Sequence, residues 1–137
     1  MQNTNLAPIV VIEDHPEYLD YLATLLRRAG YAVAPFTAAS AAVQFLQHHS
    51  ASLVITDVFM PEMDGFEVLS QVRQRFPALP IIAVSGDGPV GGPMFLDAMR
   101  QLGACATLTK PIDAGALLAA IAQCLAQPSE GPVDEAI

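Results

Sequence analysis

Two kinds of hydrophobic pattern alternate along the chain. Short runs of consecutive apolar residues are typical of strands that are buried on both faces of a parallel sheet. The longer segments that follow them carry apolar residues at every third or fourth position, which is typical of amphipathic helices. The apolar runs are Ile9–Ile12, Tyr31–Phe36, Leu53–Ile55, Ile81–Val84 and Ala104–Leu108.

Five apolar stripes with helical spacing lie between and after these runs. They consist of Leu19, Leu22, Leu26 and Ala29; Ala39, Ala42, Val43 and Leu46; Phe66, Leu69 and Val72; Phe95, Ala98, Met99 and Leu102; and Leu117, Leu118, Ile121 and Leu125. Because each right-handed crossover between parallel strands lays its helix back against the sheet, this alternation predicts helices on both faces. We therefore expect an α/β fold: a doubly wound, five-stranded parallel sheet with five helices.

The length and composition fit one compact domain. The chain has 137 residues, of which 53% are hydrophobic and 15% are charged, a profile that allows a well-filled core. We expect the folded domain to span residues 1–127. The acidic segment 128–137 is expected to form a flexible tail.

The chain is acidic, with a formal net charge of −8. Its six basic residues form no long run, so the surface would repel a nucleic-acid backbone and direct nucleic-acid binding is not expected. The N-terminus lacks a basic signal-peptide start, and no stretch reaches the roughly 18 apolar residues of a membrane span. The sequence predicts a cytoplasmic protein that does not insert into membranes.

The two cysteines, Cys105 and Cys124, lie in apolar sequence surroundings. Cysteines in such positions usually behave as small buried hydrophobic residues, and disulfides are rare in the cytoplasm. We therefore expect neither a disulfide nor a catalytic thiol.

Reactive side chains gather where the predicted strands end. In an open parallel sheet, ligands bind beyond the carboxyl ends of the strands. The first run ends in Glu13-Asp14, the third in Asp57, the fourth in Ser85 and the fifth in Lys110, the only lysine of the chain. Only the second run ends without such a group.

Three carboxylates at one edge of a sheet would repel one another unless a cation neutralises them. A hard, oxygen-liganded ion such as Mg²⁺ fits, because it takes one or two carboxylates together with phosphate oxygens. A lysine and a hydroxyl at the same edge could hold other oxygens of a phosphoryl group. One carboxylate could then act as the nucleophile in phosphoryl transfer.

Taken singly, each of these residues has an ordinary structural explanation. Glu13-Asp14 could form a turn that caps the next helix, Asp57 could be a turn acid, and Ser85 and Lys110 could be solvated polar groups. Their occurrence together at four of the five predicted strand ends favours a common functional site.

The segment 55–65, with the sequence Ile-Thr-Asp-Val-Phe-Met-Pro-Glu-Met-Asp-Gly, resembles the phosphoacceptor signature of response-regulator receiver domains of two-component systems. Glu13-Asp14, Ser85-Gly86 and 109–111 (Thr-Lys-Pro) follow the order and spacing of that family. The resemblance spans about residues 8–126 and suggests a chemotaxis-regulator-like single domain. It implies the flavodoxin-like strand order 2-1-3-4-5.

The resemblance implies a role for each matching residue. Asp57 would take a phosphoryl group from a phosphohistidine on a sensor histidine kinase or histidine phosphotransfer protein. The side chains of Glu13, Asp14 and Asp57 and the backbone carbonyl of Phe59 would hold Mg²⁺ as the cofactor.

The remaining matches concern the response to phosphorylation. Lys110 would pair with one phosphoryl oxygen, and the Ser85 hydroxyl would move to another and act as a switch. Pro111 would fix the following turn, through either a trans or a cis peptide bond.

Two positions depart from the family pattern. Thr107, three residues before the lysine, stands where the family usually has an aromatic switch residue, so no ring can rotate there and a small contribution to switching is expected. Phe59 is bulky and apolar where several members carry a polar group, which leaves the lifetime of phospho-Asp57 open.

Two other functions compete with a receiver that switches a partner-binding surface. An aspartate-nucleophile hydrolase of the haloacid-dehalogenase type would usually need a second aspartate at the position of Phe59 and a cap domain. A receiver that acts only as a phosphate sink or shuttle stays open, as does the choice between a free-standing regulator and a piece of a larger hybrid kinase. We do not expect an enzyme that turns over a separate substrate.

Overall fold

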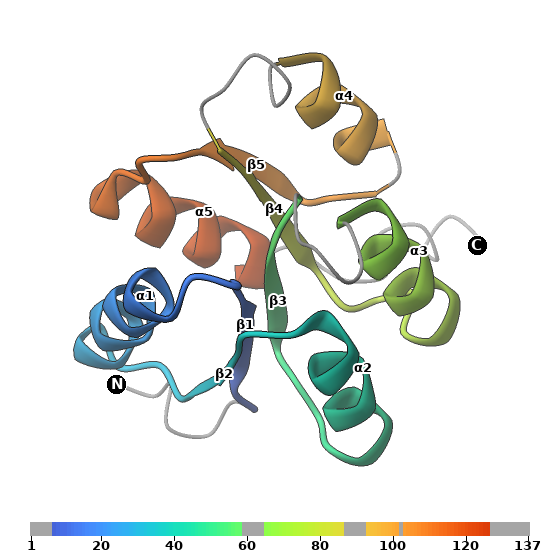
Figure 1. Cartoon of the computed structure of the whole chain (residues 1–137), viewed down its shortest axis with the longest axis horizontal. Helices are drawn as coiled ribbons and strands as arrows, with labels where there is room; N and C mark the ends of the chain where they lie inside the picture. Colours follow the sequence, from blue (N-terminus) through green and yellow to red (C-terminus); the bar gives the residue numbers. More distant parts are fainter. Residues whose placement is uncertain (1–6, 59–64, 87–92, 102, 127–137) are drawn as a thin grey trace.

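A computed structural model describes residues 7–58, 65–86, 93–101 and 103–126. Five parallel strands form one sheet in the order β2-β1-β3-β4-β5, so the predicted fold class and strand order are confirmed (Figure 1). The strands are β1 (Ile9–Ile12), β2 (Val33–Phe36), β3 (Leu53–Asp57), β4 (Ile81–Ser85) and β5 (Ala106–Thr109). The helices are α1 (Pro16–Arg28), α2 (Ala39–His48), α3 (Gly65–Arg75), α4 (Pro93–Gln101) and α5 (Ala114–Ala126).

The helices form two layers around the sheet. Helices α1 and α5 cover one face, and α2, α3 and α4 cover the other (Figure 1). Because successive side chains of a strand point to opposite faces, Ile9 and Val11 contact the first layer while Val10 and Ile12 contact the second. Both faces of the central strands are therefore buried, which explains their unbroken apolar sequence.

Two predicted strands begin later than the apolar pattern indicates. Gly30 and Gly103 have positive φ angles of 102° and 111°, a conformation that commonly ends helices. The next residue still bonds back to its helix: the Tyr31 amide donates to Leu26 at 3.1 Å and the Ala104 amide to Met99 at 3.0 Å. For this reason β2 starts at Val33 and β5 at Ala106, and β5 continues to Thr109.

The predicted helix stripes are largely the buried faces. In α1 the buried residues are Leu19, Leu22, Ala23 and Leu26, whereas Ala29 lies beyond the helix end and is exposed. In α5 they are Leu117, Ile121 and Cys124. No helix in the described part of the chain is both long enough and apolar enough to span a membrane.

The expectation that the cysteines stay unpaired is wrong. Cys105 and Cys124 form a disulfide, with their Cα atoms 6.1 Å apart, within the usual range for such a bond. Cys105 precedes β5 and Cys124 lies on the buried face of α5. Because α5 packs its apolar stripe against this side of the sheet, two positions with the character of core residues become neighbours.

Arg73 of α3 has a structural role that the sequence did not indicate. Its guanidinium donates hydrogen bonds to the carbonyls of Pro77 at 2.7 Å, Leu79 at 2.9 Å and Gly103 at 2.6 Å. A Cβ atom on residue 103 would lie only 2.8 Å from Arg73 Nε. This arginine therefore joins the end of α3 to the turn after α4, and its partial burial lowers its pKa.

Candidate functional site

The sheet brings the predicted acidic residues to one edge. Asp57 is the last residue of β3, and Glu13 and Asp14 directly follow the neighbouring strand β1. Since Ile12 pairs with Thr56, the carboxylates emerge side by side at the carboxyl ends of two adjacent strands. One carboxylate oxygen from each of the three residues lies within 4.8 Å of the others.

Two of these three carboxylates are buried. Only 2% of Glu13 and 6% of Asp57 is exposed to solvent, whereas Asp14 is partly exposed. The backbone amide of His15 donates a hydrogen bond to Glu13 Oε2 at 3.0 Å, which fixes that carboxylate at the start of α1. A buried acidic pair beside a third acid needs a nearby cation.

Lys110 supplies a cation to this cluster. Its Nζ lies 2.7 Å from Glu13 Oε1 and 2.9 Å from Asp57 Oδ2, so that the ammonium bridges the two buried carboxylates. Lys110 follows β5, two strands away from β3. The side chain therefore reaches across the end of β4 to complete the site.

Burial and pairing shift the ionisation of both partners. Burial raises the pKa of the Glu13 carboxyl above 4.5, although hydrogen bonds from Lys110 and the His15 amide oppose this shift. Burial alone would lower the pKa of Lys110, but its hydrogen bonds to Glu13 and Asp57 outweigh that effect and raise it above 10.5. The lysine is thus charged at neutral pH, and the cost of burial dominates at Glu13.

Ser85 ends β4, the strand between Asp57 and Lys110. It is fully buried, and its hydroxyl donates to the carbonyl of Gly86 at 3.0 Å. The Ser85 carbonyl in turn accepts a hydrogen bond from the Lys110 amide at 2.8 Å. Ser85 is therefore joined through the backbone to the residue that contacts Asp57.

Tyr18 of α1 belongs to the site although the sequence did not single it out. The Lys110 ammonium lies 4.9 Å from the centre of the Tyr18 ring. The Tyr18 hydroxyl accepts a hydrogen bond from the Ile112 amide at 3.0 Å. His15, Glu17, Tyr18 and Lys110 line a pocket of about 450 Å³ beside the acidic cluster.

Not every predicted site residue reaches this cluster. The Thr107 hydroxyl accepts a hydrogen bond from the Arg100 side chain of α4 at 3.1 Å, on the opposite side of β5 from α5. Phe59 and the segments 87–92 and 127–137 lie outside the described residues. The peptide bond between Lys110 and Pro111 is cis.

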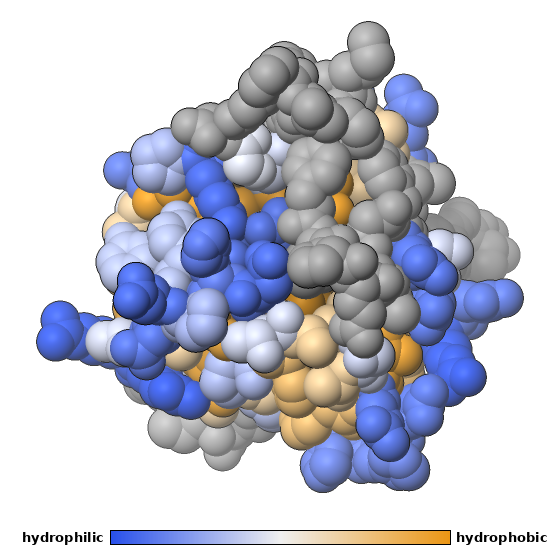
Figure 2. Space-filling view, in the orientation of Figure 1, coloured by the Kyte–Doolittle hydropathy of each residue, from blue (hydrophilic) through white to orange (hydrophobic). Residues whose placement is uncertain are grey.

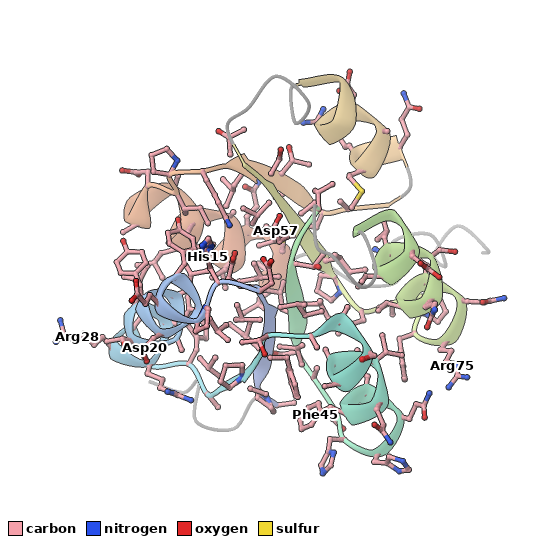
Figure 3. The ribbon with its side chains drawn as sticks, viewed as in Figure 1. His15, Asp20, Arg28, Phe45, Asp57 and Arg75 are labelled. Carbon is pink, nitrogen blue, oxygen red and sulfur yellow. A yellow bond between two sulfur atoms is a disulfide. The ribbon has the colours of Figure 1, made fainter. Side chains whose placement is uncertain are left out.

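The figures place the site at the centre of one end of the sheet. In Figure 3, Asp57 and His15 lie near the middle of the view, whereas Arg28 and Arg75 project outward at its edges. In the same orientation, Figure 2 shows hydrophilic residues in the middle of this face and at its left and right edges, with hydrophobic residues visible between them.

The chemistry of this donor set fits a hard divalent cation. Three carboxylates offer oxygens in close proximity, and oxygen is the ligand that Mg²⁺ prefers in proteins. A carboxylate with an ammonium 2.9 Å away also suits nucleophilic attack on phosphorus, because the ammonium can stabilise charge on a transferred group.

A family model described as "Response regulator receiver domain" matches residues 9–122. The chain is 37% identical over 117 residues to the response regulator protein FleR of Pseudomonas aeruginosa, covering 85% of this chain and 24% of that protein. It is 34% identical over 134 residues to the transcriptional regulatory protein FixJ of Bradyrhizobium diazoefficiens, covering 98% of this chain and 64% of the relative. The chain thus spans only part of these curated relatives.

Comparison with solved structures also identifies receiver domains as similar to this chain. A response regulator receiver domain protein from Clostridium thermocellum superposes with a TM-score of 0.80 at 28% identity, over 88% of this chain and 94% of that one. A structure described as FixJ-N also superposes with a TM-score of 0.80, at 25% identity over 93% of this chain and 98% of the other.

Proposed function

The chain belongs to the response regulator receiver domain family, and from this premise we propose that it is a phosphorylation-controlled receiver in which Asp57 accepts a phosphoryl group. The observation that best supports this role is the contact of Lys110 Nζ with Asp57 Oδ2 at 2.9 Å, inside a cluster of three carboxylates. Buried acids are rare in folded proteins unless they are paired, and this pair places a cation beside the proposed nucleophile.

Asp57 acts as the nucleophile. One of its carboxylate oxygens attacks the phosphorus of a phosphohistidine, forming a phosphorus–oxygen bond while the phosphorus–nitrogen bond breaks. The released imidazole nitrogen takes up a proton on the donor protein. Later attack of water on phosphorus releases inorganic phosphate and restores the Asp57 carboxylate.

Glu13, Asp14 and Asp57 would hold Mg²⁺ through their side chains, and the Phe59 carbonyl would add a fourth oxygen. When bound, the ion would neutralise the carboxylates and the charge that develops on the phosphoryl oxygens. In the absence of the ion, Lys110 keeps Glu13 and Asp57 in place by contacting both carboxylates, and it balances part of their charge.

Lys110 and Ser85 provide the groups that sense the phosphoryl oxygens. The Lys110 ammonium already lies within hydrogen-bond distance of Asp57. A small movement would therefore let it pair with an oxygen of a phosphoryl group attached to Asp57. The Ser85 hydroxyl would turn from the Gly86 carbonyl to another oxygen. Such differential contacts bias the fold between two states and so switch a partner-binding surface.

The donor would be a sensor histidine kinase or a histidine phosphotransfer protein, and the folded receiver would span residues 1–127 followed by an acidic tail. The net charge of the chain, −8, argues against direct nucleic-acid binding by this chain. We place the protein in the cytoplasm, where such donors present their phosphohistidine, and assign it signalling rather than turnover of a separate substrate.

The test is incubation of the purified protein with Mg²⁺ and acetyl phosphate, a small phosphoryl donor, followed by mass spectrometry of its peptides. We expect one phosphoryl group, on Asp57, only when Mg²⁺ is present. Asp57→Asn should remove the modification while leaving the circular dichroism spectrum unchanged. Equal labelling of that variant, or labelling in the presence of a metal chelator, would falsify the proposal.

A further inference from the structure

Tyr18 contacts two parts of the segment that carries Lys110. Its ring faces the Lys110 ammonium, 4.9 Å from ring centre to Nζ. Its hydroxyl accepts a hydrogen bond from the backbone amide of Ile112, 94 residues further along the chain. One residue of α1 therefore holds both the charged end of Lys110 and the backbone just after it.

The carboxylate partners of Lys110 are committed to other roles in the proposed function. Glu13 and Asp57 hold the ammonium in this structure, but both are also proposed metal ligands, and Asp57 is the phosphoryl acceptor. When these oxygens are engaged, the ring of Tyr18 remains as a neutral partner that attracts a cation without competing for metal or phosphate.

We propose that Tyr18 is the positioning residue for Lys110, and that its ring keeps the ammonium beside Asp57 during phosphoryl transfer. The hydroxyl adds a second restraint, because its bond to Ile112 fixes the turn from which the lysine side chain extends. This inference rests on the proposed function and deepens it.

The surroundings of Tyr18 favour this role over simple packing. Tyr18 is only partly buried, and with His15, Glu17 and Lys110 it lines the pocket next to the acidic cluster. A tyrosine that served only the core would not need its ring face beneath a cation. Tyr21, whose ring packs against Tyr18 at 5.6 Å between centres, is 45% exposed and provides a matched control on the same helix.

The first experiment measures the contact without any need for phosphorylation. Lys110 is the only lysine, so the protein labelled with ¹³C-lysine gives a single set of side-chain signals. We expect its Hε protons to be shifted upfield by the Tyr18 ring, and the shift to persist in Tyr18→Phe and Tyr21→Leu but vanish in Tyr18→Leu. Lysine signals that are identical in wild type and Tyr18→Leu would overturn the proposed contact.

The same signals are then recorded with Mg²⁺ and acetyl phosphate. An upfield shift that persists in the phosphorylated protein supports a ring contact that outlasts the carboxylate contacts. Loss of the shift in that state would overturn the proposal, because Tyr18 would then hold Lys110 only before the reaction.

The second experiment measures the initial rate of Asp57 labelling at saturating Mg²⁺. Loss of one cation–ring contact predicts a rate about two- to fivefold lower in Tyr18→Leu, with substantial recovery in Tyr18→Phe and no change in Tyr21→Leu. In a Lys110→Met background, Tyr18→Leu should cause no further loss, since Tyr18 acts through the lysine. The Mg²⁺ affinity should be unchanged by Tyr18→Leu.

The outcomes separate this inference from the proposed function. Equal effects of Tyr18→Leu with and without Lys110, or a parallel loss of Mg²⁺ affinity, would show a general structural defect and overturn the positioning role. Wild-type protein that is never labelled on Asp57 would instead overturn the proposed function, while the lysine spectra would still report on the contact.

Discussion

Lys110 Nζ and Glu13 Oε1 lie 2.7 Å apart, closer than the same ammonium lies to Asp57. The lysine therefore neutralises part of the charge of the two buried acids of the cluster. The third acid, Asp14, is partly exposed to solvent. Three carboxylates and one ammonium leave this site with an excess of negative charge.

The excess charge predicts that metal binding stabilises the fold. A ligand that binds the native cluster and not the unfolded chain raises the melting temperature with its concentration. We expect this from a Mg²⁺ titration followed by calorimetry, and a reduced response in Asp57→Asn. A melting temperature that does not move across millimolar Mg²⁺ would count against a metal site.

Without metal, Asp14→Asn should melt higher than wild type, by about 2–4 °C for roughly 1 kcal/mol of relieved repulsion. Asp57→Asn should gain less, because it also removes an acceptor of the Lys110 ammonium. Thermal unfolding of both variants in a chelating buffer measures the order. If Asp57→Asn gained more than Asp14→Asn, the Lys110–Asp57 pair would contribute little to stability.

The raised pKa of Glu13 predicts a specific dependence on pH. The native chain keeps a proton on Glu13 at pH values where the unfolded chain has lost it. Its contribution to the free energy of unfolding of the metal-free protein is therefore present below pH 4.5 and is lost as the pH rises through the native pKa. In denaturant titrations between about pH 4 and pH 7, the free energy of unfolding of wild type should therefore fall with rising pH relative to that of Glu13→Gln.

Lys110 should affect the stability of the fold at alkaline pH. Its pKa is raised, so its contribution to stability is complete below pH 10.5 and disappears as the pH rises through the native pKa. Lys110→Met should lack this alkaline loss. Identical alkaline unfolding of the two proteins would show that the lysine pairs add no net stability.

Ser85 and Thr107 should differ in how they transmit phosphorylation. The Lys110 amide bonds to the Ser85 carbonyl, and Ser85 is fully buried, whereas Thr107 contacts the exposed side chain of Arg100. We expect Ser85→Ala to remove most of the phosphorylation-dependent change in the amide chemical shifts of Thr109 and Lys110. Thr107→Ala should remove little, and the reverse ranking would make Thr107 the switch.

The sequence predicted Asp57 and Lys110 because a parallel sheet forces the carboxyl ends of its strands to one edge, whatever the lengths of the connections. Tyr18 could not be found this way. Its position, four residues after Asp14 on a predicted helix, resembles that of an ordinary core-facing aromatic, and its partners follow β5. The sequence also did not reveal that β2 and β5 begin later than predicted, because apolar residues that follow the end of a helix resemble those that begin a strand.

The pairing of Cys105 with Cys124 was missed for a similar reason, since both residues have the apolar surroundings of core cysteines and only the packing of α5 brings them together. A disulfide that closes a loop with a sequence separation of 19 predicts a stability gain of about 3 kcal/mol relative to the reduced protein. Reductant should therefore lower the midpoint of chemical unfolding of the wild-type protein.

The matched control is the double variant Cys105→Ala and Cys124→Ala, whose unfolding midpoint should not respond to reductant. Alkylation of the denatured wild-type protein without reductant measures the bond directly, and we expect neither cysteine to be modified. The same measurement on protein alkylated inside cells would report whether the bond also forms there. Two modified cysteines in air-oxidised, purified protein would show that α5 is held to the sheet by packing alone.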